Sequence, residues 1–317
     1  MSSEIAVLAQ PAANAGFEAR MIDLVLNGVT SVHSRRSYKT GLKAFFTWIR
    51  VEIKDGSAEP AFSKALVQQY RSSLLADRLS SSTVNLRLSP IRKLAREMAD
   101  NGMLDPATAA AIERVPGVEK RGNRLGNWLI KEQANSLLNA PDPKTLTGLR
   151  DRAILALLLG CGLRRAELLR LNVEDLQQRE GRWVLPDMEG KGNRIRTVTV
   201  PAGVKSRIDA WLTAAGITEA RLFRPVNRAG VLAGTEIRDE KAVWRLVMRY
   251  AQATDLGKLA PHDLRRTCAK LCRKAGGDLE QIQLLLGHAS IQTTERYLGT
   301  EQALAHAVND AIGLDMG

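Results

Sequence analysis

Apolar residues recur every three or four positions through the first 115 residues, which predicts a series of amphipathic helices. The clearest apolar stripe consists of Tyr38, Leu42, Phe45, Phe46 and Ile49. We expect further helices over residues 17–29, 64–79, from Ser81 onward, and 106–114. Pro90 lies inside the pattern that begins at Ser81, and because proline has no backbone N–H, we expect a kink or a later start there.

Basic side chains line a second face of two of these predicted helices. Arg35, Lys39 and Lys43 follow one another at a spacing of four residues, on a different face from the apolar stripe. The helix that begins at Ser81 carries Arg87 and Arg92 away from its own apolar positions. One face of each helix can therefore pack in a core while the other meets phosphate groups.

A segment without hydrophobic periodicity follows this helical part. Residues 116–125 contain one proline, two glycines and the basic residues Lys120, Arg121 and Arg124, a composition typical of an interdomain linker. Its charge favours a path along a nucleic acid, although a solvated charged linker stays an open alternative. We expect a flexible leader at 1–15, a helical domain at 16–115, this linker, and a second domain at 126–317.

The second domain combines helical patterns with one β-type stretch. Residues 182–186 and 195–200, joined by a glycine-rich turn, predict a β-hairpin. Helical patterns occur at 131–139, 149–160, 165–171, 203–215, 238–253, 262–275, 279–286, 291–298 and 301–313. The predicted fold class is mainly α, with an all-helical N-terminal domain and a mixed, mostly helical C-terminal domain that contains a small antiparallel β-sheet.

Composition adds an excess of positive charge to this picture. The 317 residues include 46 Lys and Arg against 34 Asp and Glu, a formal net charge of +12. Residues 1–125 contain 18 basic and 12 acidic residues, and residues 126–317 contain 28 and 22, so both domains carry the excess. This balance favours a polyanionic partner. Hydrophobic residues make up 44%, which excludes disorder as the main state.

The cysteines and the N-terminus narrow the cellular setting. The three cysteines, Cys161, Cys268 and Cys272, are too few for a disulfide framework. Glu4 stands where a signal peptide carries basic residues, and no run of about 18 apolar residues occurs, so we expect a cytoplasmic protein. Cys268 and Cys272 lie one helical turn apart with few other zinc ligands nearby, so we interpret them as buried thiols.

Two polar clusters in the second domain occur where an ordinary core does not need them. Arg164 follows an apolar helical pattern and Gly162, which places its guanidinium at a helix junction. Glu167 lies three residues later and can orient that guanidinium by a charge-assisted hydrogen bond. Lys191 lies in the glycine-rich turn of the predicted hairpin, from which its ammonium can reach a ligand.

Two more clusters lie nearer the C-terminus. His262 and Arg265 share one face of a helix that starts after Pro261, and the N-terminus of a helix favours anions. His288 precedes Tyr297 by nine residues. Taken singly, these residues also fit a helix cap, a turn or a core aromatic, and Arg164 and Lys191 fit an ion pair and a solvated turn. These structural roles explain the whole set less well, because two of the four histidines of the chain fall in these clusters.

The residue types of the four clusters suit the cleavage of a phosphodiester. Arginine, lysine and histidine supply positive charge and protons, and a tyrosine supplies a nucleophilic oxygen. Two guanidinium groups can neutralise a phosphorane where other enzymes use a metal ion, and no cluster has metal-ligand spacing. We therefore expect a covalent phosphotyrosine mechanism that needs neither a metal nor another cofactor.

These clusters are where the chain resembles the tyrosine recombinase (phage integrase) family, in particular its Xer-like site-specific recombinases. The segments GLRRAELLRL, EGKGNRIRTVTV, HDLRRTCAKL and LLLGHASIQTTERYL match the family's four catalytic boxes in order, within about residues 145–300. The resemblance implies a core-binding domain at 16–115 and a catalytic domain at 126–317. It also implies DNA recombination or integration by strand breakage and rejoining.

The resemblance assigns a role to each candidate residue. It implies that Arg164 and Arg265 are the two catalytic arginines, Lys191 the general acid for the 5′-hydroxyl, His262 the box histidine, His288 the hydrogen-bond donor to the scissile phosphate, and Tyr297 the nucleophile that forms a 3′-phosphotyrosyl link. Glu167 matches an acidic residue that supports the first arginine.

The resemblance also implies an assembly. A tetramer would bring two double-stranded DNA sites together and exchange strands through a Holliday junction, with the helix at 301–313 docked on a neighbouring protomer. Packing of that helix on its own protomer stays an alternative. Two other functions stay open on the same fold: a type IB topoisomerase-like strand transferase and a non-catalytic DNA-binding regulator.

Overall fold

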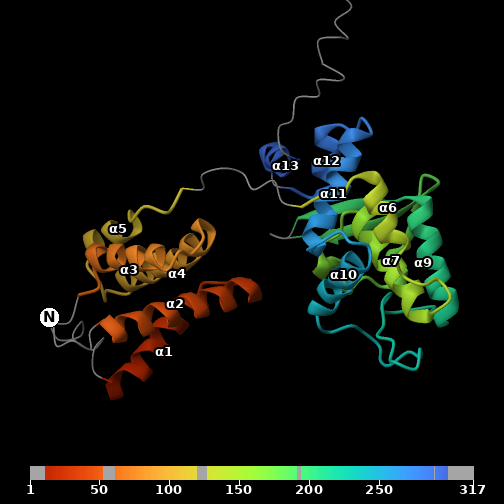
Figure 1. Cartoon of the computed structure of the whole chain (residues 1–317). Coiled ribbons are helices and arrows are strands. Elements are labelled where there is room, and N and C mark those ends of the chain that lie inside the picture. The colour runs from red at the N-terminus through yellow and green to blue at the C-terminus, as the bar shows by residue number, and fades with distance from the viewer. Residues whose placement is uncertain (1–10, 53–60, 120–126, 191–193, 289, 299–317) are drawn as a thin grey trace, which may run out of the picture. The chain divides into compact units, whose positions relative to one another are not determined.

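The computed structural model describes residues 11–52, 61–119, 127–190, 194–288 and 290–298, and only the backbone of residues 11–15, 52, 296 and 297. The chain divides into two compact units, Met1–Asn123 and Arg124–Gly317 (Figure 1). Each unit has its own hydrophobic core. The predicted mainly α fold with a small antiparallel sheet is confirmed.

The first unit is a bundle of helices. Its described helices are α1 (Pro11–Asn27), α2 (Val32–Glu52), α3 (Lys64–Ala76), α4 (Ser81–Asp100) and α5 (Pro106–Glu113). α4 packs against each of the other helices, and the apolar stripe of α2 faces it. Phe45 and Tyr70 lie edge to face in the core, with ring centroids 5.0 Å apart.

One helix start and the course of one helix differ from the sequence prediction in the first unit. α1 begins at Pro11, within the segment predicted as a flexible leader. α4 begins at Ser81 and continues without a break past Pro90, so the expected later start is wrong. The Pro90 ring is buried against Gly41 of α2, where a Cβ would lie 2.9 Å from the Pro90 Cγ. Close packing of α2 on α4 therefore offsets the hydrogen bond that the proline cannot make.

The second unit surrounds a buried helix. Its described helices are α6 (Lys131–Asn139), α7 (Leu146–Gly160), α8 (Arg165–Arg170), α9 (Ala202–Ala215), α10 (Lys241–Ala253), α11 (Pro261–Lys274), α12 (Leu279–Leu286) and α13 (Ile291–Leu298), with a 3₁₀ turn at Val173–Asp175. α7 is buried on every side from Ala153 to Leu159, as its continuous apolar run indicates. α6, α8, α9, α10 and α11 pack against it.

A three-stranded antiparallel sheet completes the second unit. The strands β1 (Gln177–Arg179), β2 (Arg182–Glu189) and β3 (Ile195–Val200) lie in the order β1-β2-β3. β2 is longer than predicted, and its register with β3 shifts between Leu185 and Met188. The short, fully exposed β1 was not predicted, because three polar residues carry no hydrophobic alternation.

Candidate active site

Arg164 lies at the junction between α7 and α8. Gly162, just after α7, has a φ of 59°, a left-handed conformation that favours glycine, and it turns the chain out of the buried helix. The Arg164 backbone N–H donates to Glu167 Oε2 at 2.8 Å, and Arg164 Nη1 donates to Glu167 Oε1 at 2.7 Å. The structure thus brings these two residues together in the contact that their spacing predicts.

Glu167 also binds Arg196 of β3, which was not among the predicted site residues. Arg196 Nη1 and Nη2 donate to Glu167 Oε1 and Oε2 at 3.1 and 2.8 Å. Burial alone would raise the pKa of the Glu167 carboxyl, but hydrogen bonds from Arg196 and Arg164 outweigh it and lower the pKa to about 2. The strand pattern contained a signal, because Arg196 is in phase with the buried Val198 and Val200.

α11 brings the second candidate arginine to the same region. Arg265 is 1% exposed, and its Nη1 and Nη2 donate to the backbone carbonyls of Gly162 and Leu286. These bonds connect α11 to the turn before Arg164 and to the end of α12. His262 lies one turn earlier on α11, and burial and then the charges of neighbouring arginines lower the pKa of its imidazole, which is therefore neutral at neutral pH.

His288 lies in the turn between α12 and α13. α12 ends at Leu286 and is capped by Gly287, whose φ is 61°. His288 Nδ1 lies 2.9 Å from Oγ1 of the buried Thr294 of α13. Burial and then the charges of Arg265 and Arg164 lower the pKa of His288 to about 4. The imidazole is therefore neutral at neutral pH and close enough to both arginines to feel their charge.

Two candidate catalytic side chains lie outside the described residues. These are Lys191 and the side chain of Tyr297, whose backbone belongs to the last turn of α13. Gly190 directly precedes Lys191, and a Cβ built on it would lie 3.0 Å from Arg164 Nη1 and 3.2 Å from Arg196 Nη1. Arg164, Arg196 and Arg265 are together called the arginine cluster. The end of β2 therefore approaches this cluster before the chain continues into Lys191.

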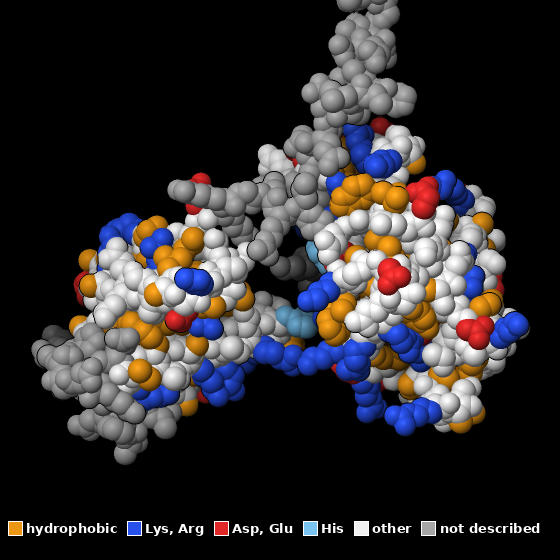
Figure 2. Space-filling model, viewed as in Figure 1, with side chains coloured by type: hydrophobic (Ala, Val, Ile, Leu, Met, Phe, Trp, Pro, Cys, Tyr) orange, Lys and Arg blue, Asp and Glu red, His pale blue; other side chains and the backbone are white. Residues whose placement is uncertain are grey.

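The DNA-binding candidates of the first unit differ in what they contact. Lys39 and Lys43 are exposed on α2, and Lys and Arg side chains appear in blue on the face of this unit in Figure 2. Arg35 donates to the carbonyl of Leu26, near the end of α1, and to that of Val29, just beyond the helix. These contacts give Arg35 a structural role that the spacing alone did not predict.

Arg92 and Arg87 also have partners inside the bundle. Arg92 Nη2 donates to the carbonyl of Val115, just after α5, at 2.6 Å. Arg87 is half-buried, and its charge acts on the Tyr70 hydroxyl, whose pKa is raised because burial outweighs that charge. The other three candidates, Lys120, Arg121 and Arg124, lie outside the described residues.

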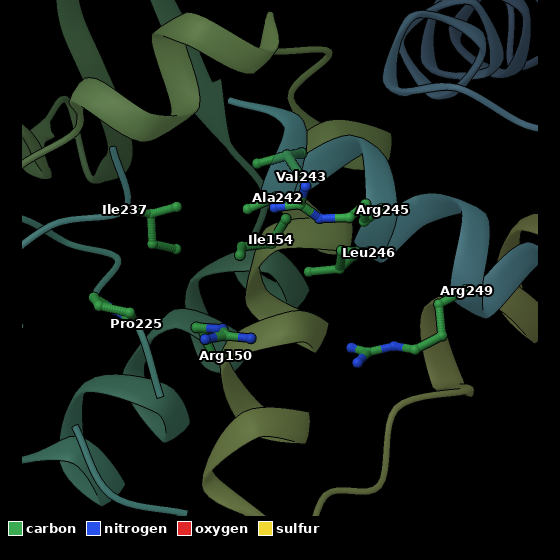
Figure 3. Close-up of a pocket in the computed structure, with 9 residues that line it drawn as sticks. All are labelled: Arg150, Ile154, Pro225, Ile237, Ala242, Val243, Arg245, Leu246 and Arg249. Atoms are coloured by element: carbon green, nitrogen blue, oxygen red, sulfur yellow. The ribbon is translucent and has the colours of Figure 1, made fainter. Parts of the chain in front are cut away.

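A pocket of about 470 Å³ in the second unit is lined by other residues (Figure 3). Its wall combines apolar side chains of α7, α10 and the loop before α10 with Arg150, Arg245 and Arg249. Figure 3 shows the Arg249 side chain directed toward Arg150, and both guanidinium groups bind the fully buried carboxylate of Asp151. None of the candidate catalytic side chains that the structure describes lines this pocket, so the arginine cluster and the pocket are separate sites.

The described part of the chain contains no group of three or more His, Cys, Asp or Glu side chains that could hold a metal ion. Cys161 and Cys268 are buried and Cys272 is half-buried. Burial raises the pKa of the Cys161 thiol to about 12. Among the same described residues, no helix is long and apolar enough to cross a membrane.

Family models match both units. Residues 127–303 match the model described as the phage integrase family, and residues 21–102 match the model described as the phage integrase N-terminal SAM-like domain. The first match includes all four sequence clusters, from Arg164 to Tyr297.

Curated relatives and solved structures agree with these matches. The tyrosine recombinase XerC of Thermodesulfovibrio yellowstonii is 32% identical over 282 residues, which cover 88% of each chain. The tyrosine recombinase XerD of Ralstonia nicotianae is 29% identical over 264 residues, which cover 82% of each chain.

Two solved structures share the fold at lower identity. The XerH site-specific recombinase, in a post-cleavage complex with a palindromic difH substrate, has a TM-score of 0.68 at 21% identity, covering 86% of this chain and 78% of the other. A lambda integrase dimer bound to a COC′ core site has a TM-score of 0.65 at 16% identity, covering 90% and 95%.

Proposed function

The chain belongs to the phage integrase family of tyrosine-type site-specific recombinases, and from that premise we propose that it cleaves and rejoins duplex DNA through a 3′-phosphotyrosyl intermediate. The Tyr297 hydroxyl oxygen attacks the scissile phosphorus and loses its proton. The bond from phosphorus to the 5′ oxygen breaks, and that oxygen takes a proton from Lys191. In rejoining, a 5′-hydroxyl attacks the phosphotyrosine and gives its proton to Lys191. The bond from phosphorus to the tyrosine oxygen breaks, and that oxygen takes its proton back.

The observation that carries this proposal is the convergence of Arg164, Arg265 and His288. Each guanidinium is held by fixed partners, the Glu167 carboxylate for Arg164 and two backbone carbonyls for Arg265. Donors fixed in this way can stabilise charge that develops on a phosphorane without reorganising. Two such cations supply the charge that a divalent metal ion supplies elsewhere, so the proposed reaction needs no metal.

His288 and His262 act in this proposal as neutral groups. The pKa of each imidazole is lowered, so each ring carries one N–H donor and one acceptor nitrogen at neutral pH. An N–H of His288 donates to a non-bridging oxygen of the scissile phosphate. His262, at the start of α11, exchanges a proton with the attacking tyrosine.

The nucleophile is tested with Tyr297→Phe. DNA trapped covalently on the wild-type protein in cells is sequenced, and a synthetic duplex with that sequence, called here the trapped-site duplex, serves as the substrate. We expect Tyr297→Phe to bind this duplex and to form no covalent adduct on a denaturing gel. Tyr250→Phe is the matched control, because Tyr250 binds Asp151 and not the arginine cluster. An adduct in Tyr297→Phe would overturn the assignment.

Lys191 is tested by changing the leaving group. A 5′-phosphorothiolate in the trapped-site duplex gives a thiolate leaving group, which needs no proton from the enzyme. We expect this substrate to restore cleavage by Lys191→Ala and not by Arg164→Ala, which lacks charge stabilisation. A Lys191→Ala protein that stays inactive on it would show that Lys191 stabilises charge instead.

We propose that double-stranded DNA is the partner and that four protomers hold two sites during exchange through a Holliday junction. The support for DNA comes from the excess of basic residues in both domains and from the DNA complexes of the two structural relatives. The segment 301–313 lies outside the described residues. Its apolar positions Leu304, Val308 and Ile312 support docking on a neighbouring protomer, because an amphipathic helix of the kind the sequence predicts there must bury its apolar stripe.

Docking in trans is tested by deleting residues 301–317. We expect the shortened protein to cleave single trapped-site duplexes but to lose synapsis of two duplexes and strand exchange. Replacing Leu304, Val308 and Ile312 by Ser should have the same effect, while replacing the polar Gln302 and Asn309 by Ser should have none. Unchanged synapsis after the deletion would contradict docking in trans.

A further inference from the structure

Arg196 is a buried cation on a strand that carries no candidate catalytic residue in its described part. Its side chain is 6% exposed and points to the buried face of β3 together with Val198 and Val200. Burying a charge is costly unless the charge is paired and its donors are bonded. The partners of Arg196 therefore indicate which arrangement of residues the buried charge stabilises.

The guanidinium of Arg196 reaches two elements that lie far from β3 in sequence. Nη1 and Nη2 grip both oxygens of Glu167 on α8, the residue that holds Arg164. Nε donates to the backbone carbonyl of Leu285, near the end of α12, at 3.0 Å. One planar group thus joins β3, the start of α8 and the end of α12, which a lysine ammonium cannot do with the same geometry.

Two glycines leave room for this side chain. A Cβ on Gly287, the residue before His288, would lie 2.8 Å from Arg196 Cδ and 3.3 Å from Arg196 Nε. A Cβ on Gly190, the residue before Lys191, would lie 3.2 Å from Arg196 Nη1. Arg196 therefore lies beside two backbone positions without side chains, each next to a candidate catalytic residue.

We propose that Arg196 is a positioning residue that holds the Arg164–Glu167 pair, the turn with His288 and the end of β2 at Gly190, which leads into Lys191, in one arrangement. All three nitrogens of Arg196 donate to Glu167 or Leu285, so its action is assigned to these partners and not to the scissile phosphate. This inference rests on the catalytic roles proposed above for the residues that Arg196 positions.

The experiment compares Arg196→Lys and Arg196→Met with the wild-type protein in single-turnover cleavage of the trapped-site duplex. A misplacement of about 1 Å can cost about 100-fold in rate, so we expect a loss of that order with DNA affinity within about threefold of wild type. The 5′-phosphorothiolate duplex should recover part of the loss, because it removes the need for a well-placed Lys191. Thermal unfolding of each variant reports on the fold.

A second pair of variants keeps the test valid if the Arg196 variants do not fold. Gly287 and Gly216 are both C-cap glycines, with φ values of 61° and 62°, so an alanine introduces the same backbone strain at each. A Cβ on Gly216 meets nothing within 4 Å, whereas a Cβ on Gly287 meets Arg196. We expect Gly287→Ala to slow cleavage about 10-fold or more and Gly216→Ala to leave it unchanged.

Three outcomes would overturn the inference. These are wild-type cleavage rates in Arg196→Lys and Arg196→Met, an equal deficit on the oxygen and phosphorothiolate duplexes, and equal effects of Gly287→Ala and Gly216→Ala. Tyr297→Phe is assayed in parallel. An adduct in that variant would refute the proposed function itself, whereas the three outcomes refute only the role of Arg196.

Discussion

The Glu167 carboxylate shows what local spacing can and cannot predict. Its contact with Arg164 follows from an i, i+3 spacing, and the structure contains it. Its contact with Arg196 joins a helix to a strand and depends on how the chain folds back, which no local spacing encodes. The alternation of β3 nevertheless places an arginine among buried positions, and such a residue needs a buried partner.

The ionised state of Glu167 makes stability depend on pH. The folded-state pKa is about 2 against an ordinary value of 4.5, so the stabilisation is complete above pH 4.5 and is lost as the pH falls toward 2. The difference corresponds to about 3 kcal/mol. We expect the unfolding free energies of wild type and Glu167→Gln to differ most above pH 4.5 and to converge in acid.

The measurement is urea unfolding at a series of pH values. Glu132→Gln is the control, because Glu132 is exposed on α6, and it should leave the pH dependence unchanged. A gap between wild type and Glu167→Gln that stays constant from pH 6 to pH 3 would contradict this account of Glu167.

We expect the Thr294 hydroxyl to set the proton position on His288 by donating to its Nδ1. A hydroxyl that donates to Nδ1 of a neutral imidazole leaves the proton on Nε2, which can then donate to a phosphate oxygen. We expect Thr294→Val, which keeps the shape but loses the hydroxyl, to slow single-turnover cleavage roughly 10-fold or more. Thr294→Ser should keep a rate near that of wild type. Equal rates for the valine and serine variants would show that this hydrogen bond does not matter.

At the scale of elements, helices with a regular apolar stripe were predicted well and short polar elements were not. The structure has α6, α12 and α13 at the predicted residues, because each has a clear apolar face and end signals. β1 has no apolar residue to reveal it. Pro90 misled the prediction of α4, because the compensating contact with Gly41 lies on another helix.

The contact between Gly41 and Pro90 predicts a coupling between α2 and α4. Gly41→Ala should gain up to about 1 kcal/mol of helix propensity but lose more through overlap with the proline ring, a net loss of about 1–2 kcal/mol. In a Pro90→Ala background, the same change should become stabilising. Urea unfolding of the two single variants and the double variant measures this coupling.

Gly16→Ala on α1 is the matched control, because a Cβ there meets nothing within 4 Å. It should be neutral or stabilising in both backgrounds. Additive effects of Gly41→Ala and Pro90→Ala would show that the two helices do not depend on this contact. The coupling matters for function because α2 and α4 carry the candidates Lys39, Lys43, Arg87 and Arg92.

At the scale of the whole molecule, composition predicted a polyanionic partner, but a spacing of basic residues does not separate phosphate contacts from structural ones. Lys39 and Lys43 are exposed, whereas Arg92 binds a backbone carbonyl inside the bundle. All three were predicted as DNA-binding candidates from the same kind of pattern, a basic residue on a helix face away from the apolar stripe. The difference depends on what packs beside each side chain, and only the folded bundle reveals it.

The salt dependence of DNA binding separates these two groups. Each phosphate contact releases a counterion, so its loss reduces the slope of log affinity against log salt by about 0.9. We expect Lys39→Ala and Lys43→Ala to reduce the slope by about that amount each, with little change in thermal stability. Arg92→Ala should instead lower thermal stability and keep the slope, because its guanidinium binds the Val115 carbonyl.

These slopes are measured by fluorescence anisotropy of the trapped-site duplex. The salt concentration is varied from roughly 50 to 300 mM, a range over which counterion release changes the affinity measurably. Thr40→Ala is the control, because Thr40 lies between the two lysines on α2 and is exposed but uncharged. A slope that falls in Arg92→Ala as much as in Lys39→Ala would place Arg92 on the DNA despite its carbonyl partner. The same basic residue would then both stabilise the helical bundle and contact DNA phosphates.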